Sequence, residues 1–434
     1  MRRQRTAGAI SVSCLLVLLA ACGSDDKKAD ETSAPTTAAA TATTTAATTA
    51  APTETTAEAT ETTEATETSA ATDDTETDDT ATDGSDTQQA DGVPAELGDG
   101  EGELNLIAWA GYTEDGTTDP EVDWVTPFEE ETGCSVNVKL GNTSDEMVQL
   151  MQTGEYDGVS ASGDATTRLI EGGEVAPVNT DLIPNYADVF EGLKLQPWNS
   201  VDGQAYGVPH GRGANLLVYN TEAFSEAPAS IKVMFEDSPA AGKLSVYDSP
   251  IYIADAAIYL MATQPDLGIT NPYALDQEQF DAAIDALTTQ KELVSQYWSL
   301  YTDQQAELAA GTVLAGTTWQ VIVGLAQTDG AKIEAVKTTE GATGWSDTWM
   351  ISSKAKHPNC MYLWMNHIIS PEANAKACEI TSEGFCDQYH AEDESYWTDV
   401  WYWTTATEEC LDGRSDVKCV PYSDWVTAWT ELRA

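Results

Sequence analysis

The strongest constraint on folding is a division of composition near residue 100. From Gly23 to about Gly100 the chain is mainly Thr, Ala, Glu and Asp, and it contains no aromatic residue. Such a segment buries too little apolar surface to offset the entropy of ordering its backbone, so we expect a disordered tether extended by its acids. A flexible coil of about 75 residues has an end-to-end distance of roughly 50 Å. Folding is therefore confined to Glu101–Ala434, and a body of roughly 330 residues favours two lobes over one core.

The first 22 residues have the order of an export signal. Three arginines within the first five residues precede an apolar run, Ile10–Leu19, that is too short to span a membrane. The run closes with Leu-Ala-Ala directly before Cys22, and this arrangement resembles the bacterial lipobox. The resemblance implies a signal peptide over 1–21, a diacylglycerol on the Cys22 thiol, and a tether over 22–100. The alternative is an ordinary secretory signal with an incidental cysteine.

The charge of the chain excludes one class of function. The formal net charge is −52 and the pI is about 4.1. Neutralisation of nucleic-acid phosphates requires basic residues, so the composition excludes a nucleic-acid-binding protein of that kind and argues against docking on anionic lipid. An acidic body favours cationic solutes, although acidity also serves solubility alone.

The cysteines indicate an oxidising compartment. Besides Cys14 and Cys22 there are six, and an even number in an exported chain predicts disulfides. The expected pairs, local ones first and the last by elimination, are Cys410 with Cys419, Cys378 with Cys386, and Cys134 with Cys360. Neither the cysteines nor the histidines have the spacing of a zinc site, so we predict no metal and no cofactor.

Short apolar strands alternate with helical patterns along the body, which predicts α/β lobes with largely parallel sheets. The helix pattern that ends at Thr132 is followed by Gly133, and Thr143–Glu146 has the form of a capping box. The expected segments are Leu104–Ala108, Trp124–Thr132, Ser135–Leu140, a helix after Glu146, Asp157–Ser160, Ala165–Glu171, Ala214–Asn220, Leu244–Tyr247 and Asp276–Trp298. In open sheets of this kind, ligands bind at the carboxyl ends of strands.

Six segments of the body, in their order and at their spacings, resemble the spermidine/putrescine-binding family of bacterial ABC importers. They are Leu104–Tyr112, Phe128–Gly133, Tyr156–Ser160, Tyr206–Pro209, Leu217–Asn220 and Gly344–Trp349. The resemblance covers Glu101 to about Ser382. It implies a type II periplasmic-binding-protein fold, in which a hinge joins two α/β lobes and the solute is trapped between them. The implied parts are a first lobe over 101–211, a second over 212–345, and a return to the first over 346–434 with a Cys- and Trp-rich end.

The family also implies partners and a location. We expect a monomeric, non-catalytic protein that passes a small amine to permease subunits, anchored by lipid outside the cytoplasmic membrane. The tryptophans of the C-terminal segment are expected to be core residues and not ligands. They are Trp397, Trp401, Trp403, Trp425 and Trp429.

The chemistry of an alkyl diamine suggests which residues bind it. Its methylenes pack on aromatic faces, and each ammonium requires a carboxylate or a cation–π contact. Trp345 and Asp347, two residues apart, supply both needs, and the matching family segment contributes an aromatic residue and an aspartate. The other positions carried over are Trp109, Tyr112, Trp319, Asp164 and Asp248. Asp164 stands where the family has an aromatic residue, and Asp248 stands near its second acid.

Arg212 favours a different solute. It replaces an aromatic residue of the polyamine-binding pattern, and a guanidinium in the site would pair with a carboxylate. The solute would then be a zwitterion such as 4-aminobutyrate, with its amine on Asp347 and its acid on Arg212. The alternative role of Arg212 is structural, holding loop carbonyls.

Two other classes of protein compete with the binding-protein interpretation. An exported hydrolase is possible in so acidic a chain, since glycoside hydrolysis needs only a pair of carboxylates. However, the chain has no Gly-x-Ser-x-Gly elbow, no His-Glu-x-x-His and no P-loop. A surface adhesin would explain the tether but not the cluster of aromatic and acidic residues.

Overall fold

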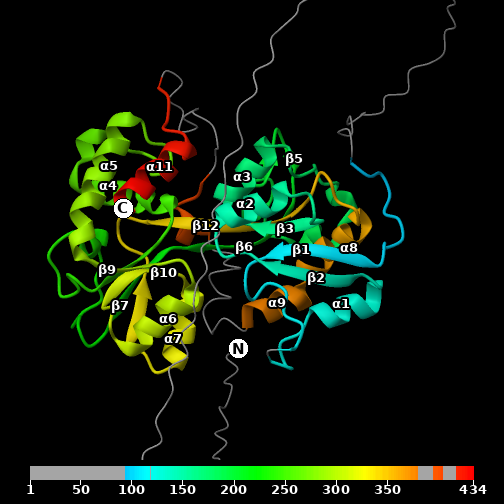
Figure 1. Cartoon of the computed structure of the whole chain (residues 1–434), viewed down its shortest axis with the longest axis horizontal. Helices are drawn as coiled ribbons and strands as arrows, with labels where there is room; N and C mark the ends of the chain where they lie inside the picture. The colour runs from blue at the N-terminus through cyan, green and yellow to red at the C-terminus, as the bar shows by residue number, and fades with distance from the viewer. Residues whose placement is uncertain (1–92, 118, 380–393, 404–416) are drawn as a thin grey trace, which may run out of the picture. The chain divides into compact units, whose positions relative to one another are not determined.

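The computed structural model describes residues 93–117, 119–379, 394–403 and 417–434. All of them belong to one compact unit, Gly84–Ala434. The unit contains two α/β lobes, each built on its own five- or six-stranded sheet (Figure 1). Among these residues, no helix is both long enough and apolar enough to cross a lipid bilayer.

The first lobe is built on a sheet with the order β13-β12-β3-β1-β2, in which β6 also pairs with β12. These strands are β1 (Glu103–Ala108), β2 (Ser135–Leu140), β3 (Gly158–Ala161), β6 (Val208–Ala214), β12 (Ala342–Ile351) and β13 (Val400–Trp401). β1 runs parallel to β2 and β3, whereas β12 runs antiparallel to β3 and β6. β12 also runs parallel to β13, so three pairings of this sheet are parallel and two are antiparallel among the described residues. The antiparallel pairings arise because β12 arrives from the second lobe and not through a helical crossover.

Helices cover both faces of this first sheet (Figure 1). They are α1 (Val125–Thr132), α2 (Ser144–Gln152), α3 (Gly163–Glu171), α8 (Pro358–Ile368) and α9 (Pro371–Glu379). Successive strand residues point to opposite faces. Leu106 accordingly joins a core with α1 and α8, while Ile107 joins a core with α2 and α3.

The second lobe has a sheet with the order β11-β7-β10-β8-β9. Its strands are β7 (Leu216–Asn220), β8 (Leu244–Tyr247), β9 (Val294–Trp298), β10 (Ala315–Thr318) and β11 (Ile333–Val336). β8 is parallel to β9 and β10, and β7 is antiparallel to β10 and β11. In the described part of the chain, the helices of this lobe are α4 (Ile253–Thr263), α5 (Gln277–Gln290), α6 (Tyr301–Ala310), α7 (Gln320–Thr328) and α11 (Tyr422–Arg433). This sheet is also mixed.

Short elements connect these parts. A hairpin pairs β4 (Ser200–Val201) with β5 (Gln204–Ala205). The 3-10 turns are η1 (Thr180–Leu182), η2 (Pro184–Asp188), η3 (Glu191–Leu193), η4 (Ile231–Met234), η5 (Pro250–Tyr252), η6 (Pro265–Leu267), η7 (Lys291–Leu293) and η8 (Glu394–Trp397). Two local predictions can be compared directly with the structure. Gly133 ends α1 with a φ of 71°, and the Thr143 side chain accepts a hydrogen bond from the Glu146 amide. The Glu146 carboxylate, however, accepts from the Asn142 amide and not from Thr143.

The lobe boundaries differ from those expected. The chain crosses between the sheets at Asn215, between β6 and β7, and returns at residues 337–341, just before β12. The C-terminal helix α11 belongs to the second lobe, although the sequence predicts that 346–434 returns to the first. Apolar packing explains this position, because Trp425 of α11 packs on Phe280 of α5 with 5.5 Å between ring centroids.

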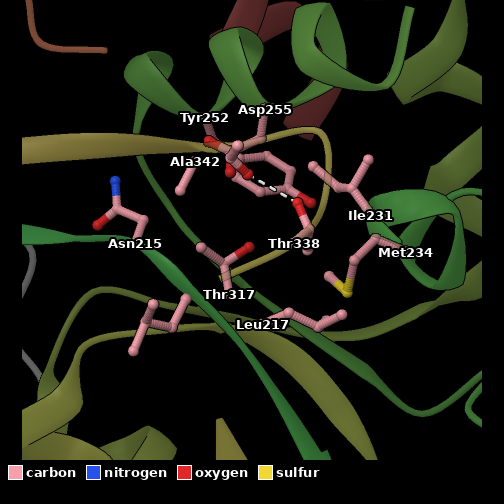
Figure 2. A pocket seen from close by; sticks show the side chains of 11 residues that line it. Asn215, Leu217, Ile231, Met234, Tyr252, Asp255, Thr317, Thr338 and Ala342 are labelled. Carbon is pink, nitrogen blue, oxygen red and sulfur yellow. Dashed lines mark hydrogen bonds between the residues drawn. The ribbon is translucent and has the colours of Figure 1, made fainter. Parts of the chain in front are cut away.

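A small cavity of about 20 Å³ lies between the two crossings (Figure 2). Asn215 and Ala342 line it from the crossing segments, and Asp255 of α4 points toward it from the second lobe. Its volume is that of about one water molecule. Asp255 is buried and accepts a hydrogen bond from the Thr343 hydroxyl of β12 at 3.1 Å. A carboxylate of the second lobe is therefore bonded to the crossing strand.

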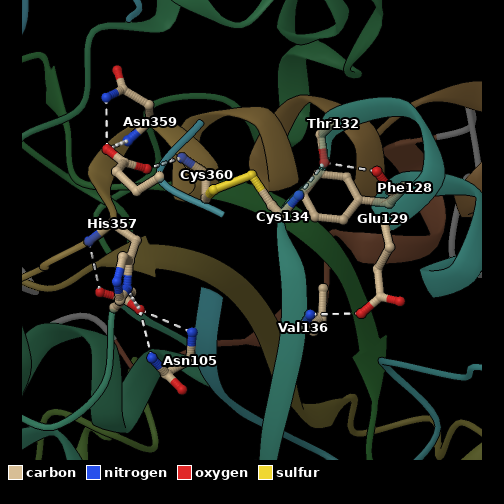
Figure 3. The surroundings of a disulfide bond; sticks show 11 residues. Asn105, Phe128, Glu129, Thr132, Cys134, Val136, His357, Asn359 and Cys360 are labelled. Atoms are coloured by element: carbon tan, nitrogen blue, oxygen red, sulfur yellow. Dashed lines mark hydrogen bonds and ion pairs between the residues drawn. A yellow bond between two sulfur atoms is a disulfide. The ribbon is translucent and has the colours of Figure 1, made fainter. Parts of the chain in front are cut away.

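One disulfide joins Cys134, just before β2, to Cys360 in α8 (Figure 3). This confirms the pair reached by elimination. Cys419 is also disulfide-bonded, but its predicted partner Cys410 lies outside the described residues. Cys386, the predicted partner of Cys378, lies outside them as well, and so does Cys22.

Candidate functional site

The candidate site lies at the carboxyl ends of the parallel strands β1 and β3, beside the middle of the antiparallel strand β12. The loop after β1 carries Trp109 and Tyr112, and Ser162 directly follows β3. β12 runs antiparallel beside β3 with Thr348 opposite Ala161, so Asp347 comes next to Ser162. Strand register thus brings together residues that are up to 235 positions apart in the chain.

Asp347 is the centre of this arrangement. Its carboxylate is 4% exposed and accepts two hydrogen bonds, from the Tyr112 hydroxyl at 2.6 Å and from the Ser162 hydroxyl at 2.5 Å. Burial raises its pKa to about 6, and the two hydroxyls oppose that rise. No ion pair among the described residues includes Asp347. A buried carboxylate without a counterion is costly, so its position favours a cationic guest.

The supporting contacts hold the two hydroxyl donors in place. Tyr112 packs on His210 with 4.2 Å between ring centroids, and its carbonyl accepts from the Trp124 indole at 3.2 Å. Ser162 occupies the N-cap position of α3, yet its side chain forms no cap hydrogen bond. Its hydroxyl is directed to Asp347 instead. A serine that would ordinarily cap a helix here serves the carboxylate.

A second acidic group lies on α2 and α3. Asp164 is buried and accepts a hydrogen bond from the Ser144 hydroxyl at 2.9 Å. Arg168 lies 3.7 Å from Asp164 and 2.7 Å from Asp145. Burial raises the Asp164 pKa, and Arg168 opposes the rise. With the acids ionised, the two carboxylates and one guanidinium carry a formal net charge of −1.

Aromatic rings from the second lobe complete the surroundings. Tyr247, at the end of β8, contacts Trp298 at 4.9 Å and Trp319 at 5.3 Å between ring centroids. The Trp319 indole donates to the Asn215 side chain at the crossing, 3.0 Å away. Burial raises the pKa of the Tyr247 phenol. The nearby carboxylates of Asp145, Asp164, Asp248 and Asp347 raise this pKa further. Tyr247 therefore lies in the field of both acidic groups.

The register of β6 and β12 separates the remaining predicted residues. Trp345 and Asp347 are two apart on β12 and share a face, and the Trp345 ring covers Gly213, where an added Cβ would lie 2.3 Å from it. Arg212 pairs with Ser346, so it projects to the opposite face from Asp347. Its guanidinium lies 4.3 Å from the Trp397 ring centroid and donates to the Gly192 carbonyl at 3.4 Å.

Two other predicted residues, Asp248 and Trp109, differ in their hydrogen bonding. Asp248 is engaged by the C-terminal helix, with the Trp429 indole at 2.9 Å and Arg433 at 3.1 Å. Trp109 is half-buried, and its indole nitrogen is buried without a hydrogen-bond partner among the described residues. The indole N–H of Trp109 is thus an unused donor on the same loop as Tyr112.

Sequence reasoning missed three residues of the site: Ser144, Ser162 and Tyr247. A signal existed for two of them, because Ser162 and Tyr247 stand at the carboxyl ends of predicted strands. That is where open sheets place their ligands. No local signal identifies Ser144, whose contact with Asp164 depends on the packing of α2 against α3.

Comparison with known proteins identifies the family. Residues 123–399 match the family described as bacterial extracellular solute-binding protein. The chain belongs to this family. Members of this family bind solutes and are not catalysts. They act in the extracellular or periplasmic space. The match begins after the aromatic loop of Trp109 and Tyr112 and ends before α11.

Individual relatives agree with this assignment. The spermidine/putrescine-binding periplasmic protein 1 of Haemophilus influenzae is 21% identical over 276 residues, which are 62% of this chain and 71% of the relative. A spermidine/putrescine ABC transporter substrate-binding protein of Streptococcus pneumoniae superposes with a TM-score of 0.57 at 18% identity, covering 76% of this chain and 99% of that one. A lipoprotein of Treponema pallidum gives 0.58 at 16% identity, with 76% and 99% covered. These structures confirm the predicted two-lobed fold.

Proposed function

We propose that this protein captures a polyamine such as putrescine or spermidine and delivers it to the permease of an ABC importer. The observation that carries the proposal is Asp347, a buried carboxylate held by two hydroxyls and lacking a cationic partner among the described residues. The Haemophilus influenzae and Streptococcus pneumoniae relatives, whose names state spermidine/putrescine binding or transport, support the same choice.

An ammonium group supplies what Asp347 lacks. Each carboxylate oxygen accepts more than one hydrogen bond, so the Tyr112 and Ser162 hydroxyls and an ammonium can bind at the same time. The half-buried Trp345 shares the face of Asp347 and offers a ring to the adjacent methylenes. The site thereby offers a primary ammonium an opposite charge and a carboxylate acceptor, and it offers the adjacent methylenes an aromatic ring.

A second negative group suits a solute with two charges. The cluster of Asp145, Asp164 and Arg168 carries a formal net charge of −1, and Tyr247 lies in the field of this cluster and of Asp347. A diamine placed with one ammonium near each group would meet a negative charge at both ends. Tyr247, Trp298 and Trp319 are the rings available to its chain.

The zwitterion is less well supported. A solute carboxylate would need a cation near the amine site, and Arg212 lies on the opposite face of the strand pair, over Trp397. We therefore favour an amine without an acidic group.

The rest of the proposal concerns delivery. The protein would be a monomer that is lipidated on Cys22 and held on the outer face of the cytoplasmic membrane. It would pass the solute to permease subunits.

Calorimetry of the purified protein with putrescine, spermidine and 4-aminobutyrate tests the proposal. We expect heat of binding with the polyamines. Asp347→Asn should weaken their binding by on the order of 2–5 kcal/mol, because it removes the charge partner of a buried ammonium. Asp255→Asn is the matched control, since Asp255 is also buried but lies at the crossing, and it should leave affinity nearly unchanged.

The pH dependence gives an independent check. Amines stay protonated at neutral and acidic pH, so only the carboxylate changes charge. With an Asp347 pKa of about 6, polyamine affinity should fall as the pH drops through 6. Heat with 4-aminobutyrate alone would contradict the choice of solute, and unchanged polyamine binding by Asp347→Asn would contradict the site.

A further inference from the structure

The C-terminal helix α11 is firmly attached to the second lobe. Trp425 is fully buried among aromatic rings, and the Lys291 side chain donates to the Leu432 carbonyl at 2.6 Å. At the end of the helix, Arg433 lies over the Tyr297 ring at 3.5 Å from its centroid and pairs with Asp248. Most of the helix therefore moves with the second lobe.

The first residue of α11 contacts the other lobe. Tyr422 is 7% exposed, and its hydroxyl donates to the Asp145 carboxylate at 3.3 Å. Its ring lies under the Arg168 guanidinium, 4.3 Å from the centroid. Asp145 and Arg168 belong to α2 and α3 of the first lobe, and they are members of the acidic cluster beside Asp164. A single side chain thus joins the second lobe to the edge of the candidate site.

A neighbouring part of the tail repeats this bridging. Trp403 packs on Trp425 at 5.1 Å and on Tyr422 at 5.3 Å between ring centroids. Its carbonyl lies against Gly163 at the start of α3, where an added Cβ would be 3.0 Å away. Tyr422 and Trp403 therefore both contact α2 or α3 of the first lobe while they pack on the second lobe.

We propose that α11 is an interlobe strap and that Tyr422 is its positioning residue. A hinge between lobes changes the distance from α11 to α3, so the Tyr422–Arg168 and Tyr422–Asp145 contacts exist only when the lobes are close. They favour closure before any solute arrives, which lowers the part of the closure energy that solute contacts must supply. The importance of closure rests on the proposed function, capture of a solute between the lobes. The bridging itself does not.

Three variants separate the strap from general loosening of the helix. Tyr422→Leu keeps apolar bulk against Trp403 but removes both contacts with the first lobe. Tyr422→Phe keeps the ring under Arg168 and removes only the donor to Asp145. Trp429→Phe is the matched control, because it removes a hydrogen bond between α11 and Asp248 within the second lobe. Among the described residues, the Trp429 ring contacts Tyr252 and Tyr297, which also belong to the second lobe.

The measurement is a distance between the lobes in the full chain without solute. Spin labels carried by unnatural amino acids at the exposed Glu155 and Glu278 would report it by pulsed electron paramagnetic resonance, independently of the tether and of the cysteines. We expect one short distance for the unsubstituted chain and for Trp429→Phe. Tyr422→Leu should give a longer or broader distribution, and Tyr422→Phe an intermediate one. Putrescine should restore the short distance, with affinity for Tyr422→Leu lowered about three- to tenfold.

The outcomes separate the two proposals. If Tyr422→Leu and Tyr422→Phe keep the distance distribution of the unsubstituted chain without solute, the strap is wrong. If Trp429→Phe opens the lobes as much as Tyr422→Leu does, the strap is also wrong, because loosening of α11 would suffice. If Tyr422→Leu opens the lobes but no amine closes them, the strap stands and the polyamine proposal fails. Circular dichroism checks that each variant is folded. If Tyr422→Leu does not fold, the distance distribution of Tyr422→Phe alone tests the strap.

Discussion

Asp255 and Asp347 are both buried, and neither forms an ion pair among the described residues. Their surroundings differ. Asp347 has two hydroxyl donors and aromatic neighbours at the strand ends, whereas Asp255 accepts from Thr343 beside a cavity with room for about one water. The first arrangement suits an ammonium ion, and the second suits a carboxyl group that holds the crossing strand.

At this scale Asp255 makes stability depend on pH. Burial raises its pKa to about 7, well above the ordinary value of about 4. Ionisation of Asp255 therefore lowers the free energy of unfolding. This loss is absent below pH 4, grows between pH 4 and pH 7, and stays constant above pH 7. We expect Asp255→Asn to raise the free energy of unfolding at pH 8 by up to roughly 4 kcal/mol, and by much less at pH 4.5.

Urea unfolding at the two pH values measures this effect. The exposed Asp266 is the control, since Asp266→Asn should change stability little at either pH. An equal gain from Asp255→Asn at pH 4.5 and pH 8 would show that ionisation of the carboxyl group is not the cause.

At the scale of elements, the disulfide joins the start of β2 to α8 across 226 residues of chain. The two elements also meet through packing, since Cys134 and Cys360 lie in one core with Phe128 and Trp364. A cross-link between distant residues mainly restricts the unfolded chain. We therefore expect the disulfide to stabilise the first lobe and to have little effect on the candidate site.

The double variant Cys134→Ala/Cys360→Ala should lose about 2–4 kcal/mol of unfolding free energy, by the usual effect of a disulfide. Polyamine affinity should stay within a few-fold of the unsubstituted chain. Denaturant unfolding with and without reductant makes the comparison, and the loss caused by reductant should be smaller in the variant. If the variant is as stable as the unsubstituted chain, this bond contributes nothing and the tie between β2 and α8 rests on packing alone.

For the whole molecule, we propose that anchoring depends on the Cys22 thiol, which lies outside the described residues. The segment before Cys22 resembles a lipobox, and the sequence predicts a tether between it and the folded body. The expected end of that tether at residue 100 is too late, because the Pro94 carbonyl accepts from Asn179 and the Gly98 amide donates to Asn359. We expect Cys22→Ser to leave the protein unlipidated and to move it from the membrane fraction to the soluble extracellular or periplasmic fraction, because a diacylglycerol provides stable anchoring. Cys14→Ser, a change within the predicted signal peptide, is the control and should leave the protein in the membrane fraction. Recovery of Cys22→Ser in the membrane fraction as fully as the unsubstituted chain would contradict lipid anchoring.

Local sequence patterns predicted much of the scaffold. The strand Ser135–Leu140, the glycine end of α1 and the Thr143 cap depend on neighbours within a few residues, so they can be recognised without the fold. The pairing of Trp345 and Asp347 on one face follows from the period of a strand. The resemblance of ordered segments then supplied the two lobes and the class of protein.

Tertiary structure decided which charges remain available. Asp248 is paired with Arg433, 185 residues away, and Asp164 shares Arg168 with Asp145. Among the described residues of the candidate site, only Asp347 is therefore left buried without a cation. Arg212 was placed on the far face by the register of β6 against β12, which no local pattern specifies. Charge pairing and strand register arise from contacts between distant parts of the chain. The sequence by itself therefore determined the family and the solute-binding scaffold, and only the folded chain determined which carboxylate can receive the solute.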